Sequence, residues 1–78
     1  MATFNTLVNV ELESARGKHA PINSAHEGYA IILEEVDEFW EQVRLKRRFR
    51  DSTEMLSELV QVAAMAQRTA EDLNLIQN

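Results

Sequence analysis

The side chains of this chain best suited to chemistry belong to two short patterns, one with two glutamates and one with a glutamate and a glutamine. Glu35 and Glu38 lie three residues apart, and Glu58 and Gln61 repeat that spacing further along the chain. In a helix, side chains three residues apart are neighbours on one face. Mg²⁺ prefers oxygen ligands of the kind these side chains offer. If the two pairs meet, a divalent cation would offset the repulsion between the carboxylates.

Helices must position these pairs, because the sequence lacks the patterns of strands. It shows neither period-two alternation nor an Asn-Gly or Asp-Gly hairpin pair, and residues that favour helices are frequent. We therefore predict an all-α fold with three helices. The predicted ranges are about Phe4–Arg16, Ser24–Leu45 and, from an Asp51 cap, about 51–75.

The predicted helix ends rest on capping residues. Thr3 and Asp51 are candidate N-caps, and Glu54 follows Asp51 at the spacing of a capping box. Gly17 is a natural residue to end the first helix, and Pro21 opposes continuation. A loop is expected from Gly17 to the start of the second helix.

Apolar stripes predict which helix faces are buried. The stripe of the second helix is centred on Val36 and comprises Tyr29, Ile32, Leu33, Val36, Phe39, Trp40 and Val43. The stripe of the third is centred on Leu59 and comprises Met55, Leu56, Leu59, Val62, Ala63, Ala66, Ala70 and Leu73. Each polar pair lies on the same flank of its stripe, so packing as an antiparallel helix hairpin would let the pairs face each other.

A single hairpin cannot cover both flanks of its own apolar stripe. We therefore expect two chains to form a four-helix core, as a homodimer or, with four chains, a dimer of dimers forming a tetramer. The substrate pocket of such an assembly would lie between subunits.

Length and charge restrict the class of protein. The 78 residues allow one small domain, 1–78, and the absence of Cys excludes disulfides and thiolate metal sites. A net charge of −5 argues against a partner that is nucleic acid. The apolar stretches are far shorter than the roughly 20 residues that cross a bilayer, and no apolar leader opens the chain. We expect a cytoplasmic protein with no membrane partner.

A longer pattern resembles a known family. The string from His26 to Trp40, followed by residues 58–66 and 71–73, is similar to a compact phage and bacterial branch of the MazG-like all-α nucleoside triphosphate pyrophosphohydrolases. Their signature is ExxE…ExxD on consecutive helices. The resemblance implies Mg²⁺-dependent cleavage of a (deoxy)nucleoside triphosphate between the α and β phosphates, giving the monophosphate and pyrophosphate. Mn²⁺ is the alternative cofactor.

The resemblance also implies roles for individual residues. Glu35, Glu38 and Glu58 would be metal ligands. The fourth ligand position holds Gln61, where the family usually has Asp, so the site carries one negative charge fewer. An amide oxygen can still coordinate a metal but cannot act as a base. Glu34 is the candidate base that activates the attacking water.

Several other residues have two alternative roles each. Lys46, Arg47 and Arg50, with Arg48 between them, either bind the triphosphate or complement the C-terminus of the second helix. His26 either contacts the substrate or hydrogen-bonds near the helix start.

Two alternatives to an enzyme stay open. One is a non-catalytic nucleotide-binding or metal-binding helical module on the same scaffold. The other is a structural helical adaptor whose carboxylates are solvated. No residue of the sequence indicates a base or sugar preference.

Overall fold

The computed structural model of the chain describes residues 2–77 and is all-helical over that range. Helix α1 spans Phe4–Lys18, α2 spans Ala25–Val43 and α3 spans Ser52–Asp72. A short 3-10 helix, η1, covers Arg47–Phe49. No strand occurs between residues 2 and 77, which confirms the predicted all-α class.

Each long helix begins at a capping side chain. Thr3, Ser24 and Asp51 are the N-caps, and each side-chain oxygen accepts a hydrogen bond from a backbone N–H in the first turn. Asp51 accepts from the N–H groups of Thr53 and Glu54, at 2.8 and 3.3 Å. These bonds satisfy N–H groups that have no partner within the helix. The helix starts predicted from Thr3 and Asp51 therefore agree with the structure.

The helix ends differ from the predicted ones. Gly17 does not end the first helix: α1 continues through it to Lys18. At its C-terminus the His19 N–H bonds to the carbonyl of Ala15, at 3.0 Å. Helix α3 ends at Asp72 rather than near Leu75, because Asn74 adopts the left-handed region with φ 55°. That conformation lets the chain turn back and close the helix.

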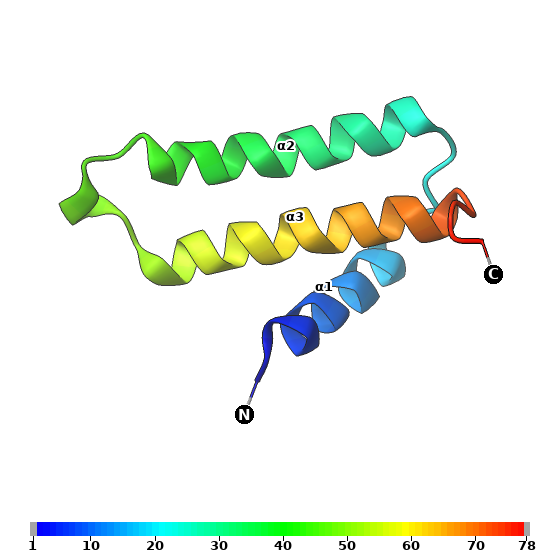
Figure 1. Cartoon of the computed structure of the whole chain (residues 1–78), viewed down its shortest axis with the longest axis horizontal. Coiled ribbons are helices and arrows are strands. Elements are labelled where there is room, and N and C mark those ends of the chain that lie inside the picture. The colour runs from blue at the N-terminus through cyan, green and yellow to red at the C-terminus, as the bar shows by residue number, and fades with distance from the viewer. Residues whose placement is uncertain (1, 78) are drawn as a thin grey trace.

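Figure 1 shows α2 and α3 side by side, with α1 lying across α3. The segment around η1 joins α2 to α3. The start of α2 lies against the end of α3, where a Cβ atom on Gly28 would come within 2.5 Å of Thr69 Cγ2. Only glycine permits this approach. The packing sets the middle of α2 beside the middle of α3, where the acidic pairs lie.

The core lies mainly between α1 and α3. Its buried members are Val8 and Ala15 of α1 and Val60, Ala64 and Met65 of α3. This placement corrects the stripe predicted for α3. Its expected centre, Leu59, is 41% exposed, and the buried face is turned toward the Val60–Ala64 flank. The reason is that α1 packs against that flank of α3.

The apolar stripe of α2 is also less covered than predicted. Its expected centre, Val36, is 42% exposed, while Tyr29 and Trp40 are 67% and 56% exposed. Gly28 is the one buried residue of α2. Helix α2 packs against α3 on one side, and α1 contributes little to covering it. The exposed part of this stripe, defined as Tyr29, Leu33, Val36 and Trp40, is called the α2 apolar face below.

A buried arginine holds the α1–α2 loop against α3. Arg68 is 4% exposed and donates a 2.7 Å hydrogen bond to the carbonyl of Ala20. Asp72 accepts from the backbone N–H of Ile22 at 2.9 Å and from Arg16 at 2.8 Å. These bonds explain why the pKa of Asp72 is lowered, first by the backbone bond and then by Arg16. They fix the loop that forms one wall of the pocket described next.

Candidate metal centre and adjoining pocket

The structure brings together three of the four residues predicted to bind a metal. Glu35 and Glu38 of α2 and Glu58 of α3 each offer one carboxylate oxygen, and these oxygens lie within 4.8 Å of one another. The three residues are called the glutamate cluster below. Two helix segments far apart in the chain thus supply converging oxygen ligands, which is the donor set that suits Mg²⁺ or Mn²⁺.

Two carboxylate oxygens of the glutamate cluster are buried without a hydrogen-bond partner to replace the lost water. Glu35 Oε2 and Glu58 Oε2 are shielded from solvent and have no hydrogen-bond partner. Burial, followed by the neighbouring charge of Glu38, raises the pKa of Glu35 to about 7. Burial and then Glu38 also raise the pKa of Glu58. Unpaired buried oxygens are costly. A divalent cation would pair them and remove the repulsion, so the residues present fit such an ion.

Gln61, the fourth predicted ligand, lies on the wall of a pocket shared with Glu35. It follows Glu58 by nearly one turn of α3, but its amide adds no charge to the cluster. Glu54 lies one turn before Glu58, and its carboxylate contributes to raising the pKa of Glu58. The Asp51 side chain caps the Glu54 N–H, while the Asp51 N–H bonds to Gln42 at 3.3 Å. The second half of the expected capping box is therefore made by Gln42.

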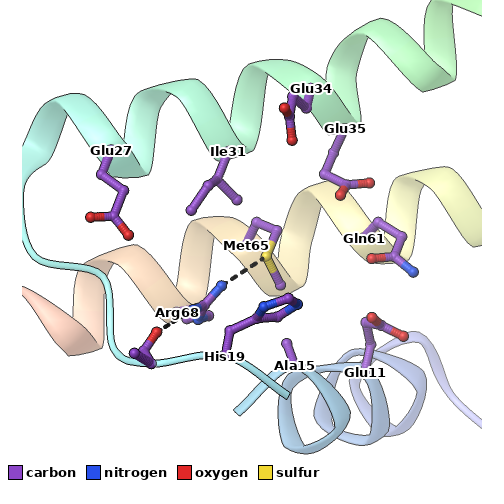
Figure 2. A pocket seen from close by; sticks show the side chains of 11 residues that line it. Glu11, Ala15, His19, Glu27, Ile31, Glu34, Glu35, Gln61, Met65 and Arg68 are labelled. Atoms are coloured by element: carbon purple, nitrogen blue, oxygen red, sulfur yellow. Dashed lines mark hydrogen bonds between the residues drawn. The ribbon is translucent and has the colours of Figure 1, made fainter. Parts of the chain in front are cut away.

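The pocket next to the cluster has a volume of about 410 Å³ and is bounded by all three helices of one chain. Figure 2 shows Glu11, Glu35 and Gln61 at one end, and Glu27 and Arg68 toward the other. Its lining residues are Glu11, Ala15, His19, Ala20, Glu27, Ile31, Glu34, Glu35, Gln61, Met65 and Arg68. A pocket already exists within a single chain, whereas the sequence led us to expect one between subunits.

Glu34, the predicted base, lines this pocket next to Glu35 and is exposed to solvent. It can therefore reach a water molecule in the pocket. The other predicted substrate-binding residues lie elsewhere. Lys46, Arg47 and Arg50 are exposed in the segment between α2 and α3, and His26 is exposed in the first turn of α2. None of these four lines the pocket.

Arg50 already has a structural contact. Its guanidinium donates a 2.5 Å hydrogen bond to the carbonyl of Val43, the last residue of α2. This bond is the helix-end role that the sequence offered as one of two readings for the basic residues. Lys46 and Arg47 have exposed side chains close to the same helix end.

Sequence reasoning missed four polar residues of the pocket: Glu11, His19, Glu27 and Arg68. Glu11 and His19 reach the pocket only because α1 docks on α3, and no local pattern announces that docking. Arg68 did leave a signal. It lies one turn after Ala64 and Met65, so a basic residue continues the buried face of α3.

Comparison with protein-family models, curated proteins and solved structures gives no match. Among the described residues, no helix combines the length and the apolar character needed to cross a membrane.

Proposed function

We propose that this protein is a Mg²⁺-dependent nucleotide pyrophosphohydrolase that cleaves a (deoxy)nucleoside triphosphate between its α and β phosphates. The observation that carries the proposal is the glutamate cluster, in which Glu35 and Glu58 each hold a buried oxygen without a partner. The motif resemblance stated above supplies the reaction. Mn²⁺ fits the same oxygen donors.

Different residues of the chain would have different roles in the reaction. Glu35, Glu38 and Glu58 would hold the cation, which, when bound, offsets the charge of the phosphates. Glu34 at the pocket wall would orient a water molecule and accept its proton. The water oxygen forms a bond to phosphorus while the anhydride P–O bond breaks. Pyrophosphate then leaves, and the nucleoside monophosphate remains.

The exposed basic residues Lys46 and Arg47 would contact the outer phosphates. Both belong to the segment that follows α2, on the far side of Glu38 from the pocket. Their charge complements a polyanion, whereas the pocket is rich in carboxylates. His26 and Arg50 have weaker support, because His26 is exposed and does not line the pocket, and Arg50 is bonded to Val43.

The experiment is a measurement of pyrophosphate release from a panel of nucleoside triphosphates with Mg²⁺. Glu38→Gln should lower the rate by at least about tenfold, because losing even a group that only hydrogen-bonds to a metal ligand costs that much. Glu13→Gln, an exposed carboxylate on α1, is the matched control and should have no effect. No release from any nucleotide, or an unchanged rate in Glu38→Gln, would reject the proposal.

Gln61 favours a second candidate, a binding module without turnover. The residue stands where a fourth carboxylate is expected, and it leaves the cluster with three charges. Calorimetry with a nonhydrolysable triphosphate separates the candidates, since a binding module binds it but releases no pyrophosphate from natural nucleotides. Turnover gained in Gln61→Asp would identify a site that has lost activity by this one substitution.

We also propose that the α2–α3 pair acts as an antiparallel hairpin that associates with a second copy. The α2 apolar face presents large side chains at helical spacing, and Trp40 and Tyr29 are more than half exposed. Contiguous apolar patches of this kind mark interaction sites. Two such faces, packed together, give the four-helix core of a homodimer, and a dimer of dimers remains compatible with it.

A further inference from the structure

The glutamate cluster stands between two regions of opposite charge. On one side, the pocket extends from Glu35 to Glu27, which lies about 12 Å earlier along α2 at 1.5 Å per residue. On the other side, α2 continues past Glu38 to the basic segment that begins at Lys46. Figure 1 shows this basic segment at the end of the α2–α3 pair opposite the α1–α2 loop. A ligand with a charged part and an uncharged part would therefore meet different surroundings on the two sides of the cluster.

The pocket carries excess negative charge. Its walls include Glu11, Glu27 and Glu34 in addition to Glu35. The one arginine, Arg68, is 4% exposed, and its guanidinium is already engaged. It bonds to the Ala20 carbonyl at 2.7 Å, to Met65 Sδ at 3.7 Å, and lies 3.7 Å from an Asp72 carboxylate oxygen. Polyphosphate would be repelled from this pocket, so among the parts of a nucleotide the uncharged nucleoside is the one that fits it.

The size and floor of the pocket suit one nucleoside. Its volume of about 410 Å³ lies in the lower part of the range for small-molecule sites. Ile31, Ala15 and Met65 supply apolar surface between the carboxylates, which a base can contact with its flat face. Figure 2 shows Ile31 and Met65 between Glu27 and Glu35, in the middle of the pocket.

Hydrogen-bond chemistry then narrows the choice of base. An ionised carboxylate only accepts hydrogen bonds. Glu27 is held in place because its Oε2 accepts the N–H of Asn23 at 3.2 Å, which leaves its other oxygen for a ligand. Adenine, cytosine and guanine present an exocyclic amino group to such acceptors. Uracil and thymine offer no amino group, and their one donor, the ring N3–H, is flanked by two carbonyls that would face the carboxylate oxygens.

We propose that the pocket between Glu11 and Glu27 is a nucleoside subsite that selects bases bearing an exocyclic amino group. The phosphates then run across the glutamate cluster toward Lys46 and Arg47. This inference deepens the proposed function and rests on it for the phosphate end, but the pocket's preference for a base stands on the carboxylates named here.

Nucleoside binding without metal tests the subsite separately from turnover. In a titration of the ¹⁵N-labelled protein in chelator, cytidine, adenosine and guanosine should shift the amide signals of Ala15, Ala20 and Met65. Uridine should bind at least about tenfold more weakly, the discrimination that a good carboxylate–base contact gives. Equal binding of uridine, or no shift at these amides with any nucleoside, overturns the proposal.

Variants connect the selectivity to particular side chains. Glu27→Gln keeps the bond to the Asn23 N–H but adds an amide donor, so it should bring uridine affinity within about threefold of cytidine. Glu11→Gln is the second variant and should reduce the preference in the same direction, while Glu13→Gln leaves it unchanged. An unaltered preference in both pocket variants contradicts the assignment. If nucleosides bind as described but no triphosphate is hydrolysed, the proposed function fails and the subsite stands.

Discussion

Replacing Glu35 by Gln should stabilise the metal-free protein near neutral pH and abolish its response to Mg²⁺. Burial and Glu38 raise the pKa of Glu35 from 4.5 to about 7. Between these values the folded chain holds a proton that the unfolded chain has released. The free energy of unfolding therefore falls as the pH rises from about 4.5 to about 7. Glutamine keeps the shape of the side chain and has no such proton to lose.

The magnitude follows from the size of the shift. At about 1.4 kcal/mol per pKa unit, the full shift from 4.5 to about 7 corresponds to an upper bound of about 3.5 kcal/mol. Glu35 is only partly buried, so solvent screening reduces the expected gain to about 1–2 kcal/mol. For a domain of this size, that gain raises the melting temperature by roughly 4–15 °C at about pH 8. Below about pH 4.5, Glu35 is protonated and neutral, as the substituted glutamine is at every pH. Wild type and Glu35→Gln should therefore melt alike there.

Mg²⁺ gives the second half of the same prediction. A cation that binds only the folded chain raises its stability by mass action, by about 2.7 kcal/mol at a hundred times the dissociation constant. Protons compete for the carboxylate, so the wild-type response to Mg²⁺ should be larger at about pH 8 than at about pH 5. Calorimetric melting of wild type, Glu35→Gln and the control Glu13→Gln at matched concentrations measures both effects. If Glu35→Gln keeps the Mg²⁺ response, or its advantage is the same at both pH values, the three carboxylates do not form one site.

Three further substitutions test the scaffold. Gly28→Ala should destabilise the protein by about 1–2 kcal/mol in thermal melting despite its better helix propensity, because the new Cβ meets Thr69 Cγ2 at 2.5 Å. Asp72→Asn should cost about 1–3 kcal/mol, since a carboxylate that is 6% exposed loses charge-assisted bonds to Ile22 and Arg16. Val36→Glu should shift the sedimentation equilibrium from dimer to monomer, because it places a charge at the centre of the α2 apolar face.

Each of these three predictions would be contradicted by a different result. Thr69→Ser removes the methyl group that meets the new side chain, so a double variant no more stable than Gly28→Ala would locate the cost elsewhere. The Asp72→Asn effect should fade as the pH falls through the lowered pKa of Asp72, because the stability from a depressed acid exists only above that value. A constant difference at acid pH would mean that charge is not the cause. Unchanged mass for Val36→Glu would remove the α2 apolar face from the interface.

The parts of this fold that depend on local sequence were predictable. The helix starts follow from a hydrogen bond between a cap and the next turn, as at Thr3 and Asp51. Glu35 and Glu38 share a helix face because of their spacing alone. Their convergence with Glu58 needed only the assumption that two long helices joined by a short segment lie side by side. These inferences require few contacts between distant parts of the chain.

The parts that depend on how α1 docks were not predictable. Leu59 and Val60 are adjacent apolar residues, and only the presence of α1 decides that Val60 is buried and Leu59 exposed. The same docking brings Glu11 and His19 to the pocket. In the second helix, Val36 was expected in a buried seam because the apolar stripe is real. Within one chain Val36 remains 42% exposed.

Helix α2 contributes to the pocket on one side and carries the α2 apolar face on the other. This arrangement decides whether the protein can dimerise and bind a nucleoside at the same time. At about 100° per residue, Glu27 and Ile31 lie roughly 140–180° around the helix from Val36. Glu27 and Ile31 line the pocket, whereas Val36 centres the α2 apolar face. A second chain packed on that face therefore approaches from the side away from the pocket and leaves its mouth open. Val36→Glu should accordingly abolish dimerisation while cytidine still shifts the pocket amides, and loss of both together would show that the pocket needs the second chain.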